Sequence, residues 1–239
     1  MQNIYVISDI HACIRTFKSM LKKINFSKED LLIINGDIID RGGKNNLSII
    51  KFISTFNNII LLRGNHEEFF LRWDSKELAE RDWYRFGGAN TLFEIKNMNI
   101  DDFLFFRNFI VKTKLFYEIS INGVDYIISH NGYNVDLNFI YDKDNLINLS
   151  SSILSMYEQD WFNFFVSSDI HYTTHLKFDK FPIVGHVPTI QIIDEPKIFR
   201  HSKYFDIDCG CSYKGGKLGC LRLNDLQEFY VNIDKNDLI

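Results

Sequence analysis

Three short polar strings in the first third of the chain carry residue types that bind metals and phosphate. They are Asp9-Ile10-His11, the segment 36–42 and the segment 64–67. Together they hold carboxylates, imidazoles, an amide and an arginine, and each string comes directly after an apolar run. Burying several acids and imidazoles in one place is costly unless a cation neutralises them. The strings therefore predict a metal site.

Two later histidines extend the candidate ligand set. His130 and His186 each follow an apolar run, at 126–129 and 181–184, and a strand end favours metal ligation over a role in the core. The set exceeds the needs of one catalytic metal and suits two metals that share a carboxylate. Its imidazole and oxygen ligands favour Mn²⁺, with Fe, Zn or Ni as alternatives. The candidate metal ligands are Asp9, His11, Asp37, Asn65, His130 and His186.

The residues beside these ligands predict chemistry on a phosphate ester. Two neighbouring metals can activate water and clamp the attacking and leaving oxygens of an in-line displacement. Arg41 and Arg63 flank the ligands, and a guanidinium group matches phosphate oxygens. We expect these two arginines, together with Asn65, to bind the substrate phosphate. His66 can protonate the leaving oxygen, and Asp40 can orient the His66 ring.

The elements that must position these residues begin with three apolar runs, at 4–7, 31–34 and 59–62. Stretches with helical spacing, at 14–24 and 47–56, separate them. Alternating strands and helices predict a parallel sheet with right-handed crossovers. Ligands bind outside the carboxyl ends of such strands, and the three polar strings lie there.

The rest of the chain is expected to complete a single domain, residues 1–239. Residues 73–109 have a helical pattern with a break at Gly87-Gly88, and we expect a helical cap or insertion over about 73–110. The runs 115–121 and 124–129, joined by Asn122-Gly123, predict a hairpin. Later apolar runs predict a second, mixed sheet packed on the first. These runs lie at 183–184, 190–193, 205–207, 218–223 and 229–233.

Composition excludes several classes of protein. The chain has 239 residues, 46% of them hydrophobic and 24% charged, as in an ordinary globular domain. A net charge of −4 argues against a nucleic-acid binder with a broad basic surface. No segment approaches the roughly 18 apolar residues of a membrane span, and we expect no signal peptide and no membrane partner. The four cysteines are irregularly spaced, which indicates reduced thiols and a cytoplasmic protein.

These strings resemble the signature of the calcineurin-like metallophosphoesterases, in the phosphoprotein phosphatase branch. Ser129-His130 and the segment 184–189 resemble the late histidine motifs of that family, and 208–218 resembles a strand and turn of its bacterial members. The resemblance spans residues 5 to about 223. It implies an α/β fold of two mixed sheets packed as a sandwich between helices.

The resemblance also implies ligand assignments and a reaction. The first metal would be held by Asp9, His11 and Asp37. The second would share Asp37 and add Asn65, His130 and His186. A metal-bridging hydroxide would attack phosphorus directly, with His66 and Asp40 as the acid pair. The function implied is a bacterial serine/threonine or dual-specificity protein phosphatase, acting on a phosphorylated protein or a small phosphoester. A diadenosine tetraphosphate hydrolase and a non-catalytic phosphate-binding scaffold are the alternatives.

Two positions depart from the bacterial pattern. Where relatives carry Asn in a Trp-x-x-Asn-Gly-Gly string, this chain has Phe86, and where they carry Arg after a Trp, it has Asn163. Neither position is a ligand, so the departures concern the substrate pocket. We expect the other polar and aromatic candidates to be structural. They are His171, His175 and His201 at the surface, with His175 the first exception to consider, Cys209 and Cys211 as small packing residues, and Trp73, Trp83 and Trp161 in the core or cap.

Overall fold

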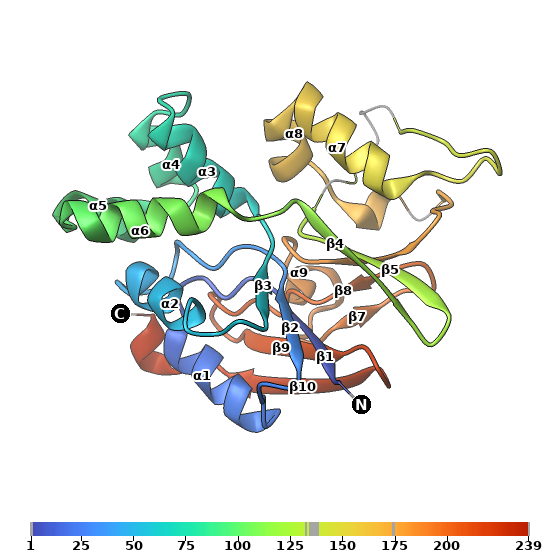
Figure 1. Cartoon of the computed structure of the whole chain (residues 1–239), viewed down its shortest axis with the longest axis horizontal. Coiled ribbons are helices and arrows are strands. Elements are labelled where there is room, and N and C mark those ends of the chain that lie inside the picture. Colours follow the sequence, from blue (N-terminus) through green and yellow to red (C-terminus); the bar gives the residue numbers. More distant parts are fainter. Residues whose placement is uncertain (1, 132, 134–138, 174, 239) are drawn as a thin grey trace.

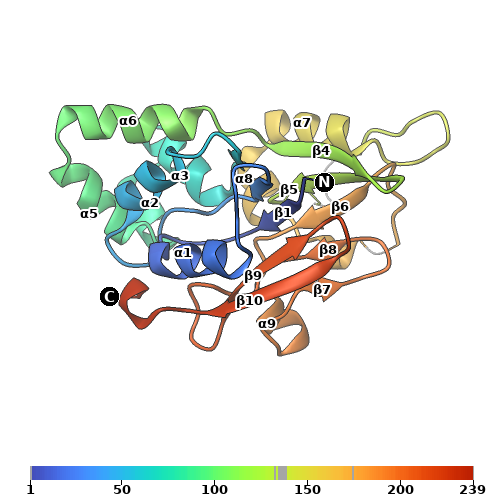
Figure 2. The ribbon, with the colours of Figure 1, turned by 60° about the horizontal axis from the view of Figure 1, so that its bottom comes forward.

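Two five-stranded sheets pack face to face, with helices on both outer sides (Figure 1). The computed structural model describes residues 2–131, 133, 139–173 and 175–238. The second view shows the C-terminal strands beside the N-terminal ones (Figure 2). The expected sandwich of two mixed sheets between helices is therefore confirmed. No helix in the described part is long and apolar enough to cross a membrane.

The first sheet positions the three polar strings. Its parallel strands follow the apolar runs, and β1 also pairs antiparallel with β9. Alternate side chains of β1 serve two cores, because successive residues of a strand point to opposite faces. Tyr5 and Ile7 pack toward helices, while Val6 packs between the sheets. In spatial order the strands are β10 (Gln227–Asn232), β9 (Lys217–Arg222), β1 (Ile4–Ile7), β2 (Leu31–Ile34) and β3 (Ile59–Leu61).

The second sheet begins with the expected hairpin. Asn122 and Gly123 have φ of 52° and 79°, the left-handed conformations that a tight two-residue hairpin turn requires. The core between the two sheets joins Val6 and Ile33 of the first to Ile128 and Ile183 of the second. In spatial order the strands are β4 (Phe116–Ile121), β5 (Val124–Ser129), β6 (Phe181–Val184), β8 (Phe205–Asp206) and β7 (Phe199–Arg200).

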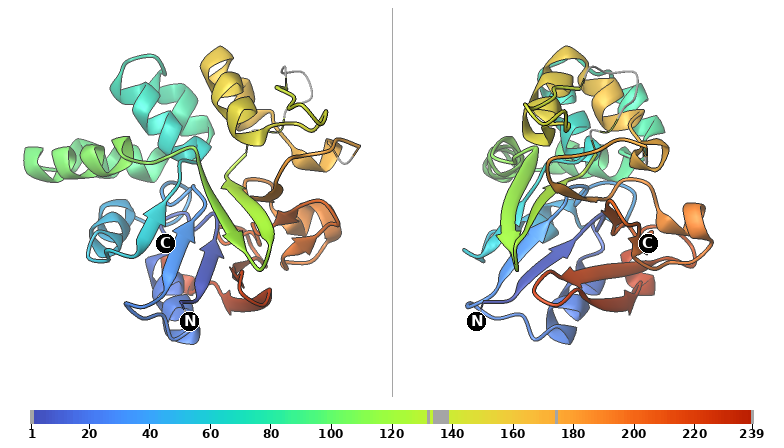
Figure 3. Two further views of the ribbon diagram at one scale, coloured as in Figure 1. Left: turned by 45° about the vertical axis from the view of Figure 1, so that its right-hand side comes forward. Right: turned by 90° about the vertical axis from the view of Figure 1, so that its right-hand side faces the viewer.

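Helices cover the outer faces and the top of the sandwich (Figure 3). The α1 and α2 helices pack on the first sheet, whereas α7 and α8 pack beyond the second. The region predicted as a cap is helical, with its break at Gly87-Gly88, and its role as a lid over the site stays a prediction. The helices are α1 (Ile14–Lys23), α2 (Asn46–Ile53), α3 (Asn65–Asp74), α4 (Glu80–Arg85), α5 (Ala89–Asn97), α6 (Ile100–Val111), α7 (Leu149–Gln159), α8 (Trp161–Val166) and α9 (Thr189–Ile193), with single 3-10 turns η1 (Ile170–Tyr172) and η2 (Lys235–Asp237).

The chain's last turn packs against its first helix. The N-cap residue of α1 is Cys13, and its side chain makes no capping hydrogen bond. Instead Asp237 accepts hydrogen bonds from the backbone N–H groups of Arg15 and Thr16, at 3.1 and 2.7 Å. The carbonyl oxygen of Asp237 also accepts from the N–H of Gly43, at 2.7 Å. One residue near the C-terminus therefore ties α1 to the loop that follows β2.

Two expectations about the late runs are wrong. The runs 218–223 and 229–233 form β9 and β10, which extend the first sheet rather than the second, because β9 pairs with β1. The run 190–193 lies in the short helix α9, which ends at Asp194 in the left-handed conformation. A four-residue apolar run carries no periodicity that separates a strand from a helical turn.

Candidate metal centre

The loops after β1, β2 and β6 contain an unusual number of non-glycine residues with left-handed backbone. Such φ values are uncommon for residues with a side chain and gather at functional sites. Here they turn the chain sharply at the strand ends. They occur at Asp9 (52°), His11 (48°), Ala12 (57°), Asp37 (51°), Asp40 (69°), Arg41 (59°) and His186 (77°).

Two glycines let the loops after β2 and β3 approach each other closely. A Cβ atom on Gly36 would lie 2.7 Å from Gly64 backbone atoms and from His130 Nδ1. A Cβ atom on Gly64 would lie 2.1 Å from Asp37 Oδ1. Both glycines are therefore required to bring the second and third polar strings together.

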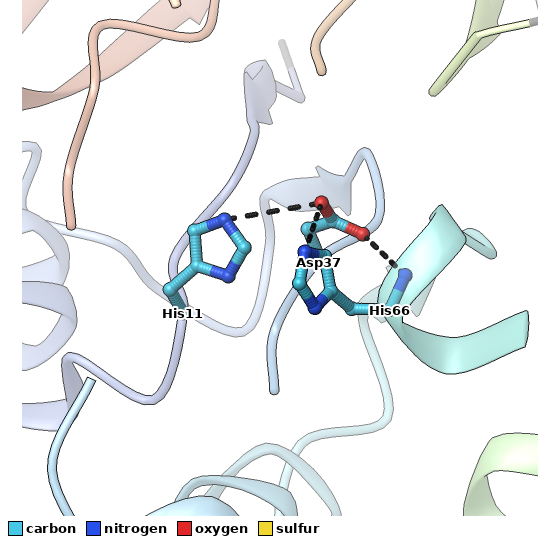
Figure 4. A group of neighbouring side chains, drawn as sticks. All are labelled: His11, Asp37 and His66. Atoms are coloured by element: carbon cyan, nitrogen blue, oxygen red, sulfur yellow. Dashed lines mark hydrogen bonds and ion pairs between the residues drawn. The ribbon is translucent and has the colours of Figure 1, made fainter. Parts of the chain in front are cut away.

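A first group of candidate ligands consists of His11, Asp37 and His66, whose ligand atoms lie within 4.8 Å of one another (Figure 4). The Nε2 atoms of both histidines are 3.8 Å from Asp37 Oδ2. The backbone N–H of His66 donates to Asp37 Oδ1 at 3.0 Å. Distance alone thus places His66, expected as the acid, within reach of a cation as well.

A second group shares Asp37 and adds His130 and His186. Asp37 Oδ2 lies 3.3 Å from His130 Nε2. The side-chain oxygen of Asn65 lies 3.0 Å from His130 Nε2 and 2.9 Å from His186 Nδ1. Four of the expected ligands, contributed by three loops and the start of α3, thus converge on one point. Asp37 is the residue common to both groups.

Backbone carbonyl groups orient two of the histidine rings. His11 Nδ1 lies 2.9 Å from the carbonyl oxygen of Ile39, and His130 Nδ1 lies 2.8 Å from that of Asn35. An N–H donated from each Nδ1 leaves the opposite nitrogen, Nε2, facing the cluster, where it can bind a cation once it carries no proton. Metal-binding histidines are held in this way.

Asp9 is buried beside the cluster. Its Oδ2 accepts from the His186 backbone N–H at 3.1 Å and from the Ser8 hydroxyl. Its Oδ1 is buried and has no hydrogen-bond partner within the described ranges. Because an unpaired buried carboxylate oxygen is costly, this atom favours a cation beside it. The donor set therefore fits the divalent metals expected.

The electrostatics of the cluster follow from burial and from attraction between the acids and the histidines. Burial raises the pKa of Asp9 to about 6 and lowers the pKa of His186 to about 3. Burial also holds the pKa of His11 well below its usual value. Burial acts against charge on Asp37 and His130 too, but opposite charges outweigh it. His130, His66 and His11 hold the Asp37 pKa well below its usual value, and Asp37 and Asp9 raise the pKa of His130 to about 10. A cation that binds His130 must therefore displace its proton.

His66 and Asp40 form the expected pair. His66 Nδ1 lies 2.6 Å from Asp40 Oδ2, which also accepts from Trp83 Nε1–H at 2.7 Å. The Thr91 hydroxyl donates to Asp40 Oδ1. The buried Nε2 of His66 has no hydrogen-bond partner in the described structure. Trp83 lies in the core as expected, and it also orients Asp40, a contact that no spacing in the sequence signals.

The two arginines differ in their surroundings. Arg41 is half-buried, and its Nη1 lies 3.1 Å from His11 Nε2, at the cluster. Arg63 instead donates from Nη1 to Glu68 at 3.2 Å and from Nε and Nη2 to Thr113, both at 3.1 Å. A phosphate-binding role for Arg63 stays a prediction, and its contacts favour joining α3 to the segment before β4.

Glu67 is a structural residue of the site whose role the sequence reasoning did not predict. Its buried carboxylate accepts from the backbone N–H groups of Asp37, Ile38 and Gly64, at 2.8, 2.9 and 2.8 Å. It therefore joins the loop after β2 to the start of α3. The signal was available, because an acid three residues after a helix N-cap, here Gly64, is typical of a capping box.

The expectation for His171 is wrong. Its side chain is only 11% exposed, with Nδ1 2.6 Å from Asp169 Oδ1 and Nε2 3.4 Å from Asp206 Oδ2. Rings of Phe199 and Tyr204 pack against it. The prediction of a surface residue relied on the polar residues next to His171 in the sequence, and these do not indicate its burial. His175 is exposed, as expected for a surface residue, and all four cysteines are buried free thiols.

The whole arrangement matches a known family. A family model described as calcineurin-like phosphoesterase matches residues 2–223. This chain belongs to that family. Its candidate ligands thus lie in a phosphoesterase fold, and the expected resemblance is confirmed.

Relatives of two activities are similar to this chain. Serine/threonine-protein phosphatase 2 of Salmonella typhimurium is 30% identical over 217 residues, which is 88% of this chain and 89% of that protein. A symmetrical bis(5'-nucleosyl)-tetraphosphatase of Wigglesworthia glossinidia brevipalpis is 46% identical over only 65 residues, 26% of this chain and 24% of that protein. The solved structure of a candidate diadenosine tetraphosphatase shares the fold, with a TM-score of 0.63 at 13% identity over 98% of this chain and 95% of that one.

Proposed function

We propose that this chain is a dimetal-dependent phosphomonoester hydrolase that acts as a serine/threonine or dual-specificity protein phosphatase. The observation that carries the proposal is that His11 lies close to one side of Asp37 and His130 and His186 close to the other. His66 lies beside them, and its Nε2 has no hydrogen-bond partner among the described residues. The 30% identity to a serine/threonine phosphatase, which extends over 89% of that relative, supports the protein substrate.

The proposed cation sites use the residues that the loops bring together. The first would be held by Asp9, His11 and Asp37, and the second by Asp37, Asn65, His130 and His186. Divalent cations bound there would supply Lewis-acid chemistry, polarising the phosphoryl group and lowering the pKa of water. Mn²⁺ is our first choice because the ligands combine imidazole nitrogen with oxygen.

The chain's own residues would perform the remaining steps. Arg41 would hold phosphate oxygens with its guanidinium group. His66 would give a proton from Nε2 to the oxygen of the departing alcohol, while Asp40 holds the opposite ring nitrogen 2.6 Å away. Phosphate would be released without a covalent bond to the protein.

Chelation combined with a substrate panel tests this proposal. We expect EDTA to abolish hydrolysis and Mn²⁺ to restore it. The panel contains a phosphoserine peptide, a phosphotyrosine peptide, an aryl phosphate and diadenosine tetraphosphate. Hydrolysis of the phosphopeptides supports the proposal. Full activity after chelation, or no turnover with two bound cations, contradicts it, and the latter result would support a phosphate-binding scaffold.

The second candidate is a dinucleoside tetraphosphate hydrolase. The 46% identity over 65 residues to a bis(5'-nucleosyl)-tetraphosphatase favours it. The same centre would then act on a phosphoanhydride. A strong preference for diadenosine tetraphosphate in the panel would replace the first candidate by the second.

A further inference from the structure

A row of aromatic rings begins beside His66 and leads away from the metal centre. The centroid of the buried Phe69 ring lies 5.6 Å from that of His66. Phe86 stacks on Phe69, with centroids 4.7 Å apart and ring planes at 21°. The first departure from the family pattern, Phe86, is thus one ring removed from the proposed acid.

Helix α8 contributes two more rings to this row. The Phe162 centroid lies 6.2 Å from Phe86, and that of Trp161 lies 6.4 Å from Phe69. Figure 1 shows α8 next to α3 and α4 above the sheets. Phe86 and Trp161 are half-buried and Phe162 is 37% exposed, so part of each of the three side chains is accessible to a ligand. We call Phe86, Trp161 and Phe162 the aromatic wall.

The aromatic wall also starts beside the proposed phosphate contact. The backbone N–H of Arg41 donates to the carbonyl oxygen of Gly87 at 3.1 Å. A Cβ atom on Gly87 would lie 2.8 Å from Arg41 Cγ, so the chain after Phe86 is packed directly on this arginine. A leaving group that starts at His66 Nε2, with its phosphate at Arg41, would extend along the wall.

The second departure removes a charge from the same region. Asn163 lies on α8 next to Phe162, and its Nδ2 donates to Asp160 Oδ2 at 2.7 Å. Its backbone N–H also donates to Asp160, at 3.0 Å. The side chain of this residue therefore stabilises the start of α8. Beside Asn163, α8 carries the rings of Trp161 and Phe162, and the Arg72 guanidinium group lies 5.0 Å from the Trp161 centroid.

We infer that the aromatic wall holds the leaving group and selects phosphomonoesters of aromatic alcohols, the class to which phosphotyrosine belongs, over those of aliphatic alcohols. This inference rests on the proposed function. In the reaction, a water oxygen bonds to phosphorus and the bond between phosphorus and the aryl oxygen breaks. The electron pair of that bond stays on the aryl oxygen, which takes the proton from His66. The products are a phenol and inorganic phosphate.

A comparison of two peptides tests the inference. They share one sequence and carry either phosphotyrosine or phosphoserine, and kcat/KM is measured for each with Mn²⁺. We expect Phe86→Leu and Phe162→Ala each to lower the ratio of phosphotyrosine to phosphoserine hydrolysis by about 3- to 10-fold, the effect of one lost ring contact. Phenolate is intrinsically a better leaving group than the serine alkoxide, but this difference affects the ratio equally in every variant. It therefore cancels when the ratios of two variants are compared.

Phe105→Ala is the matched control. Phe105 lies on α6 with 38% exposure, close to the 37% of Phe162. Among the described residues, no ring contact joins Phe105 to the wall. We expect this variant to keep the wild-type ratio. Thermal unfolding and Mn²⁺ content establish that each variant is folded and loaded, and Phe86→Leu preserves apolar volume in case the alanine variant does not fold.

The outcomes separate the inference from the proposed function. An unchanged ratio in folded Phe86→Leu and Phe162→Ala variants that hydrolyse both peptides overturns the inference and leaves the phosphatase proposal intact. A wild-type protein that hydrolyses neither peptide overturns both. Hydrolysis of diadenosine tetraphosphate by the same variants is measured as well. If the variants lose only this activity, the inference is overturned, because the ring held by the wall would then be a nucleobase.

Discussion

At the scale of single residues, the two ring nitrogens of His66 lie in different surroundings. Asp40 holds Nδ1 at 2.6 Å, and Nε2 is buried without a partner in the described structure. Asp40 in turn is held by Trp83 and Thr91. The ring is therefore fixed with one nitrogen toward the cluster, which is the arrangement that a proton donor needs.

We expect His66→Asn to lower turnover of a phosphopeptide by about 10²- to 10⁴-fold, the usual contribution of a positioned acid. Metal content should stay at the wild-type level, because Asp9 rather than His66 completes the proposed first site. Metal analysis of both purified proteins, beside kcat, checks this. Loss of one cation in the variant would instead make His66 a ligand, as its 3.8 Å distance from Asp37 permits.

His130 predicts the pH dependence of metal uptake. Burial opposes its charge, but Asp37 and Asp9 raise its pKa to about 10, so it is protonated at neutral pH until a cation arrives. Binding should then release about one proton, and the affinity should rise about tenfold per pH unit between about pH 6.5 and 8.5. Calorimetric titration with Mn²⁺ in buffers of different ionisation enthalpy counts the protons. An affinity independent of pH would contradict this prediction.

At the scale of elements, the polar loop after β2 is held by the start of α3. The two carboxylate oxygens of Glu67 accept hydrogen bonds from three backbone N–H groups of these two segments. An amide has one acceptor oxygen, so Glu67→Gln leaves buried donors without an acceptor.

We expect Glu67→Gln to lower the free energy of unfolding by about 1–3 kcal/mol, the cost of unsatisfied buried hydrogen-bonding groups. Urea unfolding of the metal-free proteins measures this without a contribution from cation binding. Glu29→Gln is the control, since the Glu29 side chain is 78% exposed. Equal stability of the two variants would show that Glu67 does not hold the loop.

Elements formed by local patterns could be predicted, while those that depend on distant pairing could not. The apolar runs of β1, β2 and β3 and the Asn122-Gly123 turn of the hairpin carry their own signals. The β9 strand joins the first sheet because Val6 faces Leu221 across more than two hundred residues. The sequence of a short apolar run does not indicate which of two sheets the strand will join.

The same distinction applies to the candidate site. Asp9, His11, Asp37 and Asn65 follow strands, so the loop geometry could be anticipated from their spacing. The buried His171 and the contact of Trp83 with Asp40 depend on side chains from other elements. The different directions of Arg41 and Arg63 also depend on other elements. Arg63 donates hydrogen bonds to Glu68 and Thr113, which direct its side chain away from the cluster.

At the scale of the whole molecule, the last turn ties the fold together. Asp237 is fully buried and accepts from Arg15, from Thr16 and, through its carbonyl oxygen, from Gly43. The first helix is thus capped by a residue from the opposite end of the described chain. This contact also restrains the loop that carries Asp40 and Arg41.

We expect Asp237→Ala to lower the free energy of unfolding by about 0.5–2 kcal/mol, as the loss of a helix cap does. Asn236→Ala is the control, because the exposed Asn236 side chain donates a hydrogen bond to Asp234, just before η2, and makes no other among the described residues. Thermal or urea unfolding measures both. A loss of stability in the control equal to that in Asp237→Ala would contradict a specific cap.

The left-handed backbone at Asp9, His11, Asp37 and His186 has a consequence for laboratory evolution. Each non-glycine residue in this conformation costs about 1–2 kcal/mol that glycine would not pay. A screen that rewards heat resistance alone would therefore enrich glycine at these positions and discard the proposed metal ligands. Libraries built on this scaffold need selection for catalysis in every round, because here stability and chemistry compete for the same residues.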